Sequence, residues 1–312
     1  MAIVLGSNQY GKAETHLVRV VRDSPRHEIT DLNVSSALRG DWSAAHLEGD
    51  QSAILPTDTQ KNTAYVWAKT HPVDPIEEYG LSLARHFVED IEPVISARIE
   101  IEKFGWQRAV VDGHEHDYAF TRTGPEIRTA AITVGPDGQH VIQGLKDLVL
   151  LKSTGSAFGG FLVDEYTTLE PTDDRVMATS LVAKWRVSAD PSSANSSSAD
   201  SSGANDVDWN ALYDGVKAVL VEKFATLHSL ALQQTLWHMG RAALEAYPQI
   251  AELKLSAPNK HHFVVDFSRF GLDNNNEVFH ADDRPYGLIQ ADVVRDDALP
   301  AGEAWRSYSG LV

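Results

Sequence analysis

The 312-residue chain contains no cysteine, which excludes disulfides, thiolate metal sites and cysteine nucleophiles. It also carries little positive charge, with 27 basic against 44 acidic residues and a formal net charge of -17. No nucleic acid and no anionic membrane surface is expected as a partner, because phosphate binding requires a basic surface. A small anionic substrate remains possible, since a few buried cations can hold it whatever the surface charge.

Long apolar runs are also missing from the sequence. No stretch approaches the roughly 20 apolar residues of a membrane-spanning helix. The N-terminal residues lack the basic start and apolar segment of a signal peptide. Three common catalytic signatures are absent as well: a glycine-rich phosphate loop, His-Glu-x-x-His and Gly-x-Ser-x-Gly. We therefore expect a cytoplasmic protein whose chemistry must come from other residues.

Alternation of apolar and polar residues predicts an α+β fold that repeats its elements. In the first half we expect strands at 16–22 and 27–38, helices at 62–69 and 75–92, and strands at 94–106 and 109–120. In the second half we expect strands at 126–134 and 140–151, helices at 209–224 and 232–247, and strands at 253–255 and 262–267. Each half is thus a hairpin, a helical pair and a hairpin, which predicts modules at residues 1–125 and 126–312.

Residues 188–208 differ from the rest of the chain, because nearly all are Ser, Ala, Asp, Asn or Gly. Such a segment buries no apolar surface to offset its ordering entropy, so we expect a flexible surface insertion. A linker between independent domains is the alternative. The insertion is preferred because the strand before the segment and the helix after it fit the same half.

Two histidine clusters are candidate metal sites. The run His114-Glu115-His116-Asp117 is more simply interpreted as a solvated hairpin tip, because it follows the turn pair Asp112-Gly113. His261 and His262 are adjacent on an expected strand, where neighbouring side chains point to opposite faces. Composition and spacing therefore lead only to a two-module α+β protein.

Five stretches of the chain resemble the urate oxidase family, and they occur in that family's order. Together they span nearly the whole sequence. They are Tyr10-Gly11-Lys12, the segment from Thr57-Asp58-Thr59 through Lys61-Asn62-Thr63, the region 151–185 with Lys-Ser-Thr-Gly-Ser-Ala-Phe-Gly-Gly-Phe, Gln233-Gln234-Thr235-Leu236, and Pro258-Asn259-Lys260-His261.

The resemblance implies tandem T-fold modules, each an antiparallel sheet with two helices on one face. It implies a homotetramer with a tunnel-shaped sheet assembly and active sites at subunit interfaces. It also implies oxidation of urate by O2 without any metal or organic cofactor. The chain ends Gly310-Leu311-Val312, unlike the Ser-Lys-Leu peroxisomal ending of many eukaryotic members, so a bacterial-type cytoplasmic enzyme is expected.

The resemblance also assigns a catalytic set. Lys12 matches the family's catalytic lysine, which deprotonates urate, and Thr57 relays the proton through its hydroxyl. His261 completes the relay and orients the water that hydroxylates the oxidised intermediate. Taken singly, each residue has a plainer role, Lys12 as a solvated turn lysine and Thr57 as a loop cap. Within the ordered set of motifs the functional roles are preferred.

Six further residues would bind the substrate. Arg175 and Gln233 grip one edge of the ring, and Phe158 stacks on its face, although core packing is the commoner role of such a phenylalanine. Asn259 lies over the ring near the oxygen or water position. Asp58 offers its main-chain N–H, and Leu232 stands where the family often has valine.

Two alternatives remain open. The first is another T-fold enzyme that processes pterins or purines; such enzymes often hold a metal through His or Cys ligands. The second is a purine-binding protein that has lost catalysis, which the presence of Lys12, Thr57 and His261 disfavours.

Overall fold

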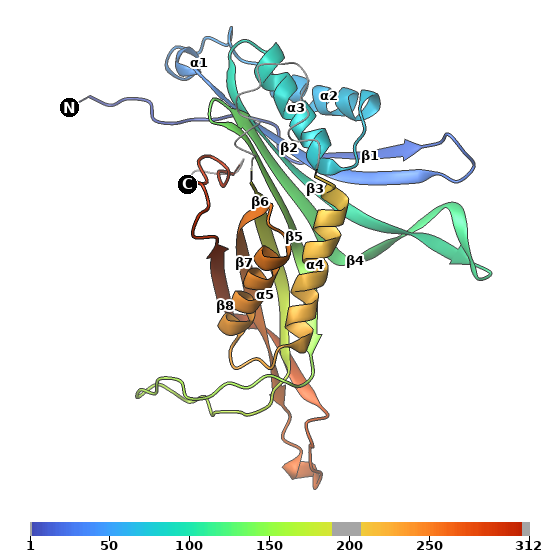
Figure 1. Ribbon diagram of the computed structural model, residues 1–312, viewed down its shortest axis with the longest axis vertical. Helices are drawn as coiled ribbons and strands as arrows, with labels where there is room; N and C mark the ends of the chain where they lie inside the picture. Colours follow the sequence, from blue (N-terminus) through green and yellow to red (C-terminus); the bar gives the residue numbers. More distant parts are fainter. Residues whose placement is uncertain (1, 189–206, 308–312) are drawn as a thin grey trace. The chain divides into compact units, whose positions relative to one another are not determined.

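The computed structural model describes residues 2–188 and 207–307 of the chain (Figure 1). Its first elements are β1 (Thr15–Val21), β2 (Glu28–Gly40), α1 (Ser43–Leu47), α2 (Thr57–Thr70), α3 (Ile76–Asp90), β3 (Val94–Val111) and β4 (His114–Gly135). They are followed by β5 (Gly138–Lys152), β6 (Met177–Val187), α4 (Trp209–Thr226), α5 (Leu232–Ala246), β7 (Ile250–Val264), a 3₁₀ turn (Ser268–Phe270) and β8 (Phe279–Val294).

The eight strands found in the described residues form a sheet in which each strand neighbours the next in the sequence, from β1 to β8. Pairing is antiparallel between β1 and β2, β2 and β3, β3 and β4, and β7 and β8. The turn between β3 and β4 has positive φ at both Asp112 (51°) and Gly113 (79°). A two-residue turn of this kind matches the twist of antiparallel strands, which confirms the hairpin predicted at this pair.

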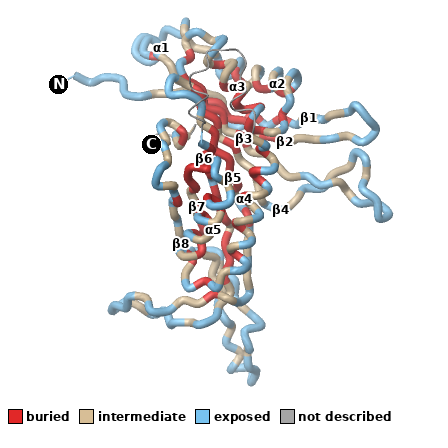
Figure 2. Tube along the Cα trace, viewed as in Figure 1, coloured by how far each residue is buried: buried red, intermediate tan, exposed pale blue. Residues whose placement is uncertain are grey.

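The chain's contacts divide it into two compact units, and each is described separately. Unit 1 comprises the described parts of Met1–Gly144, Arg186–Ala211 and Leu299–Val312. Its core lies where α3 packs on β3 and β4, as the buried segments of these elements in Figure 2 show. The apolar face of α3 carries Ile76, Tyr79, Leu83 and Phe87 at helical spacing, and each is at most 1% exposed. This stripe was predicted from the sequence, and it explains why the segment forms a helix.

A buried charge network lies at the N-terminus of α3. Glu77 is fully buried and accepts hydrogen bonds from Arg128 Nη2 at 3.0 and 2.9 Å and from Gln143 Nε2 at 2.9 Å. Gln143 Nε2 also donates to the carbonyl oxygen of Trp209 at 2.8 Å, and Arg128 Nη1 donates to Asn210 Oδ1 at 2.6 Å. The network therefore joins α3, β4 and β5 to the beginning of α4 within unit 1.

Unit 2 comprises Leu145–Trp185 and Leu212–Ala298. Here α5 packs against β7 and β8 through a buried stripe that includes Leu232, Leu236, Met239 and Ala243. The carboxyl end of α5 is fixed by Arg295, whose Nη2 donates to Leu244 O and, at 3.3 Å, to Tyr247 O. The helices α4 and α5 begin at Trp209 and Leu232, the residues expected from the sequence.

Five predicted elements need correction. The helix expected at 62–69 begins at Thr57, so the preceding polar stretch is helical too. The strands expected at 109–120 and 126–134 belong largely to one continuous strand, β4, and those at 253–255 and 262–267 belong to β7 for most of their length. β8 was not predicted. The module boundary near residue 125 falls inside β4 and stays a prediction, while most of the Ser/Ala/Asp-rich segment 188–208 lies outside the described residues.

Candidate active site

Lys12 lies on the segment just before β1 and is anchored to β2 through its main chain. The Ser36 N–H donates to Lys12 O at 2.9 Å, and the Lys12 N–H donates to Ser36 Oγ at 3.3 Å. Lys12 is half-buried, whereas Ser36 is buried in unit 1. The lysine is therefore carried by a well-fixed backbone and not by a solvated turn.

Thr57 and Asp58 occupy the first turn of α2, after the N-cap residue Pro56, and both side chains are exposed. The first turn of a helix leaves main-chain N–H groups without intrahelical partners, which suits the predicted donor role of Asp58. The Asp58 carboxylate is paired with Lys61 and accepts a hydrogen bond from Asn62 Nδ2 at 3.1 Å.

These contacts give the Asp58 carboxyl an unusual acidity. Its pKa lies below the ordinary value, first because Lys61 donates a hydrogen bond to it and also because of the Lys61 charge, with a smaller contribution from the charge of Lys12. The Ser36 Oγ that accepts the Lys12 N–H also donates to Gln60 Oε1 of α2 at 2.8 Å. Unit 1 therefore holds the main chain of Lys12 close to the first turns of α2, and the catalytic roles of Lys12, Thr57 and Asp58 stay predictions.

In unit 2 the predicted substrate residues Phe158 and Arg175 are in contact. The guanidinium carbon of Arg175 lies 5.0 Å from the centre of the Phe158 ring. Phe158 is fixed by main-chain hydrogen bonds to Thr172 at 2.8 and 2.9 Å. Arg175 is fixed by Ser156: its N–H donates to Ser156 O at 2.8 Å and its Nε to Ser156 Oγ at 3.3 Å. Burial lowers the pKa of Arg175, which nevertheless remains a cation at neutral pH.

The segment that carries Phe158 is also tied to the start of α5, where Leu232 and Gln233 lie. The Ala157 N–H donates to Ser229 O at 2.7 Å, and the Ser229 and Thr235 hydroxyls are 2.6 Å apart. Gln233 is exposed at the first turn of α5, whereas the Leu232 side chain is only 3% exposed and packs into the core of unit 2. Leu232 can therefore offer a ligand its main-chain N–H but not its side chain.

Asn259 and His261 lie on β7, on either side of an irregularity in its pairing with β8. Asn259 is opposite Gly287, while His261 is opposite Asp282, so Lys260 falls within a bulge. The His261 ring stacks on Phe263 with a centroid distance of 5.7 Å, and His262 Nδ1 lies 3.1 Å from Lys260 O. The two neighbouring histidines thus have different surroundings, as their positions on a strand predicted.

The nine predicted residues therefore form two groups. Lys12, Thr57 and Asp58 belong to unit 1; Phe158, Arg175, Leu232, Gln233, Asn259 and His261 belong to unit 2. The predicted relay of Lys12, Thr57 and His261 spans both groups and stays a prediction. Sequence analysis did not single out Ser36, Ser156 and Ser229, which support these groups through partners distant in the chain. Ser156 lies within the quoted stretch that resembles the family, but no local motif marks Ser36 or Ser229.

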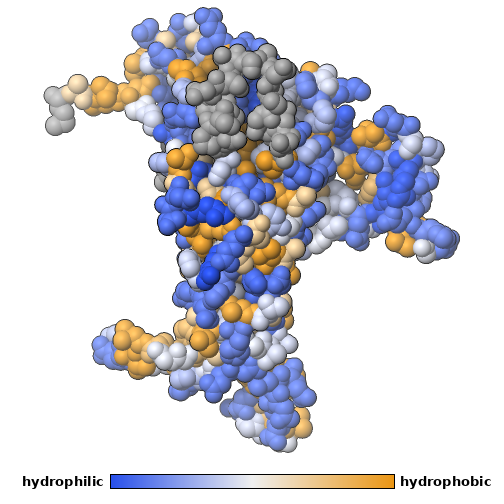
Figure 3. Space-filling view, in the orientation of Figure 1, coloured by the Kyte–Doolittle hydropathy of each residue, from blue (hydrophilic) through white to orange (hydrophobic). Residues whose placement is uncertain are grey.

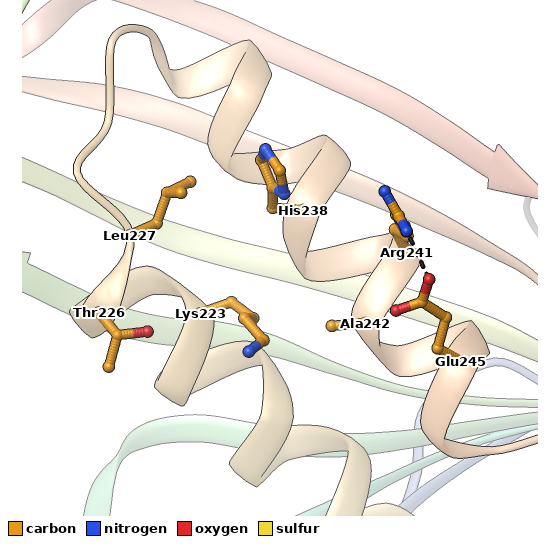
Figure 4. Close-up of a pocket in the computed structure, with 7 residues that line it drawn as sticks. All are labelled: Lys223, Thr226, Leu227, His238, Arg241, Ala242 and Glu245. Carbon is orange, nitrogen blue, oxygen red and sulfur yellow. Dashed lines mark hydrogen bonds and ion pairs between the residues drawn. The ribbon is translucent and has the colours of Figure 1, made fainter.

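Other candidate sites are less suited to catalysis. His114–Asp117 lie at the tip of the β3–β4 hairpin, where Glu115 Oε2 accepts a hydrogen bond from Arg26 at 2.5 Å. Among the residues described, no group of three or more His, Asp or Glu side chains has metal-binding geometry. A groove of about 330 Å³ lies between α4 and α5 (Figure 4). None of the predicted site residues lines it, and its cations Arg241 and Lys223 are already paired, with Glu245 at 2.7 Å and Glu222 at 3.1 Å.

One exposed segment is strongly apolar. Between β5 and β6, Leu162 is 93%, Val163 68% and Tyr166 81% exposed. Figure 3 shows the corresponding hydrophobic tip on the surface of this segment. The turn at the tip is ordered by Asp164, whose Oδ1 accepts hydrogen bonds from the Tyr166 N–H at 3.0 Å and the Thr167 hydroxyl at 2.8 Å.

No helix in the described part of the chain is both long and apolar enough to cross a membrane.

An antiparallel sheet accompanied by two pairs of helices, α2 with α3 and α4 with α5, is the architecture of the T-fold class of α+β proteins. Solved structures agree. The crystal structure of uricase from Arthrobacter globiformis superposes with a TM-score of 0.86 at 46% identity, covering 96% of this chain and 98% of that one. A uricase from Bacillus fastidious shares the fold at 22% identity, with a TM-score of 0.76 and coverage of 93% and 94%.

Sequence comparison identifies the family. The family model described as Uricase matches residues 8–133 and 141–290. The uricase of Arthrobacter globiformis is 46% identical over 309 residues, which is 99% of this chain and 96% of the relative. The uricase of the yeast Cyberlindnera jadinii is 34% identical over 301 residues, 95% and 99% of the two chains. The chain belongs to the uricase family.

Proposed function

We propose that the protein oxidises urate with O2 and water to 5-hydroxyisourate and releases hydrogen peroxide. Two electrons pass from the urate ring to O2, which takes up two protons to become peroxide, and the water oxygen becomes the new hydroxyl. A deprotonated purine is electron-rich enough to serve as its own reductant, so the proposal includes no cofactor. Membership of the uricase family and full-length similarity to uricases support this activity.

The observation that carries the proposal is the pairing of Arg175 with Phe158. A flat, anionic, heteroaromatic substrate needs a ring to stack on and a cation at its edge. Phe158 offers the ring, and Arg175 is held beside it by the fully buried Ser156. Gln233, on the adjoining turn of α5, adds an amide that can both donate and accept at the same edge.

The base in this proposal is Lys12, which takes a proton from urate and passes it through the Thr57 hydroxyl toward His261. A general base of this kind contributes about 10²- to 10⁴-fold in rate. The anchored backbone of Lys12 supports the role, and so does its hydrogen-bond link through Ser36 Oγ to Gln60, on the helix that carries Thr57 and Asp58. His261 would orient the attacking water, and Asn259, two residues earlier on β7, would hold O2 or water over the ring.

The main-chain N–H groups of Asp58 and Leu232 complete the proposed substrate contacts. The Asp58 carboxylate is occupied by Lys61 and Asn62, which reduces its repulsion of an anionic ring. Leu232 presents its N–H at the first turn of α5, where the helix dipole also favours a negative ligand.

We further propose that the catalytic set is completed by association into a homotetramer, in which each site takes Lys12, Thr57 and Asp58 from one subunit and the six site residues of unit 2 from its neighbour. The separation of the nine residues into two groups in different units supports this arrangement. The exposed apolar tip at Leu162, Val163 and Tyr166 supports association as well, because burying such side chains is favourable. The proposed partners are urate, O2 and other copies of the chain, in the cytoplasm.

Oxygen uptake and peroxide release on adding urate to purified, chelator-treated protein test the reaction directly. The expected result is one O2 consumed and one peroxide released for each urate lost from the absorbance spectrum. Urate that binds without being consumed would instead identify a catalytically inactive purine-binding protein. Turnover that disappears with chelation and returns with added metal would contradict the cofactor-free reaction.

A further inference from the structure

Gln60 is a polar side chain buried in the first turns of α2. It is only 1% exposed, although it follows three exposed residues of the same helix, Thr57, Asp58 and Thr59. Burying an amide is unfavourable unless its donor and acceptor atoms find partners, because each unmatched atom loses its hydrogen bond to water. The partners of Gln60 therefore indicate what the residue does.

The Gln60 amide connects Lys12 to the turn that carries Thr57. Ser36 Oγ donates to Gln60 Oε1 at 2.8 Å. Ser36 Oγ also accepts the Lys12 N–H at 3.3 Å. Gln60 Nε2 in turn donates to Leu55 O, two residues before Thr57, at 3.3 Å. A continuous chain of hydrogen bonds thus runs from the main chain of Lys12 through the buried side chains of Ser36 and Gln60. Because Gln60 follows Thr57 on α2 and binds Leu55 O before it, this chain holds the backbone on both sides of Thr57.

The backbone beside Lys12 has no room to shift toward β2. A Cβ atom placed on Gly11 would lie 1.8 Å from Ser36 O and 2.9 Å from Ala37 Cα. Glycine is required at this position because the two backbones approach so closely. The segment that carries Lys12 is therefore pressed against β2 at Gly11 and held there by Ser36 at Lys12.

We propose that Ser36 and Gln60 are positioning residues that set the distance between Lys12 and Thr57. The inference rests on the proposed function, in which these two residues exchange a proton. Proton transfer requires heavy atoms at about 2.6–3.2 Å, so a small shift of the base interrupts it. A buried hydrogen-bond network holds one geometry because every alternative leaves a polar group unsatisfied. Ser36 and Gln60 act on the reaction only through the position of Lys12.

A matched control is provided by Ser35, the neighbour of Ser36 on β2. Ser35 is 4% exposed, and its Oγ accepts the Glu14 N–H at 2.8 Å. It therefore holds the same segment by the same kind of bond, but two residues beyond Lys12 and with no part in the bonds to α2 described above. Comparing Ser35→Ala with Ser36→Ala separates a role in holding the segment from a role in placing the base.

The experiment measures kcat and KM for urate in Ser36→Ala, Gln60→Met, the double variant, Ser35→Ala and Lys12→Ala. We expect kcat to fall about 10- to 100-fold in Ser36→Ala and Gln60→Met, because a misplacement of about 1 Å has effects of this size. KM should stay within about twofold of wild type, since the substrate clamp is untouched. Ser35→Ala should retain kcat within about twofold, as a change outside the reacting groups does.

Coupling between the variants gives a second, independent readout. The double variant of Ser36 and Gln60 should be no slower than the slower single variant, because both interrupt one network. In a Lys12→Ala background, Ser36→Ala should leave the residual kcat unchanged. If Ser36→Ala fails to fold, Gln60→Met is combined with Lys12→Ala instead, and the residual kcat of this double variant is compared with that of Lys12→Ala alone.

Three results overturn the inference. Wild-type kcat in both Ser36→Ala and Gln60→Met, with Lys12→Ala inactive, removes the positioning role but leaves the proposed function intact. A loss of kcat from Ser36→Ala that persists in the Lys12→Ala background shows that Ser36 acts by another route. Full activity of Lys12→Ala itself contradicts the proposed base, and the inference fails with it.

Discussion

The Arg175 guanidinium lies over the Phe158 ring, with 5.0 Å between its central carbon and the ring centre. Both side chains are half-buried, and both are fixed through main-chain hydrogen bonds, to Ser156 and Thr172 respectively. A cation and an aromatic ring held in this way form a preorganised surface for a planar anion, so little conformational entropy is lost when one binds.

Arg175→Lys should weaken urate binding while the fold persists. Lysine keeps the charge but loses the planar fork that contacts two atoms of the substrate and the Ser156 hydroxyl. We expect KM to rise about 10- to 100-fold, in line with about 1.5–3 kcal/mol for a charged hydrogen bond. Steady-state kinetics provide the measurement. Arg241→Lys, at an exposed ion pair on α5, is the control and should leave KM unchanged.

The rate should depend on pH through the proposed base. A lysine accepts a proton only in its neutral form, so kcat should rise as the pH increases from neutral into the alkaline range. Lys12→Ala should lower kcat by about 10²- to 10⁴-fold and remove that rise. A pH profile of both proteins measures the effect. A flat wild-type profile over this range would count against Lys12 as the base.

Sites shared between subunits predict complementation between two inactive variants. Thr57→Ala removes a group from unit 1, and Arg175→Gln removes a group from unit 2. Dissociating and reassociating an equal mixture should restore activity at roughly a quarter of the sites, if copies assort at random in a symmetric oligomer. Each variant treated alone provides the control. An inactive mixture, shown by mass spectrometry to contain hybrid oligomers, would mean that each site is built within one chain.

Acidification should destabilise the protein through His140. Burial is the main reason that the pKa of His140 lies below its ordinary value of 6.5, and the charge of Arg186 lowers it further. The unfolded chain therefore binds the proton more readily than the folded one. The contribution of neutral His140 to the free energy of unfolding should be fully present above pH 6.5. It should decline as the pH falls from 6.5 through the lowered pKa that His140 has in the folded protein. In urea unfolding, the free energy of unfolding of His140→Gln should fall less with decreasing pH than that of wild type. His114→Gln, on the exposed hairpin tip, should show the same pH dependence as wild type.

Breaking the buried pair of Glu77 and Arg128 should be strongly destabilising. Glu77→Ala leaves the Arg128 guanidinium without its carboxylate inside unit 1, which costs about 3–5 kcal/mol. Replacing both residues, in Glu77→Leu with Arg128→Met, should recover most of that loss. The free energy of unfolding at one protein concentration is the measurement. Glu245→Ala, at an exposed pair, should change it by less than about 1 kcal/mol.

Elements with one buried face were the ones that the sequence predicted well. α5 begins at Leu232 as expected, because its apolar residues recur at helical spacing and are buried. β8 was missed because it lies at the edge of the sheet and is exposed along most of its length, so no alternation marks it. The strands expected at 109–120 and 126–134 are largely one strand, because Gly124 and Pro125 fall opposite a pairing irregularity at Gly105, where β4 continues past them.

The candidate site was predictable only as far as family resemblance extends. The resemblance pointed to Lys12, Thr57 and Arg175, but it could not indicate what holds them. The supports are Ser36, Gln60 and Ser156, whose bonds join segments far apart in the sequence. Hydrogen bonds of this kind follow from the fold and leave no local pattern in composition or spacing. Whether the two groups meet across subunits depends on an assembly that a single chain does not specify.

The start of α4 is fixed by contacts with two strands and by a cap residue directly before it. Trp209 and Asn210 are bound by Gln143 and Arg128, and Asp208 Oδ1 accepts the Ala211 N–H at 2.9 Å. A peptide tag inserted between Val207 and Asp208 should therefore leave the first turn of α4 in place, so that the enzyme could be tethered without altering its proposed catalytic residues.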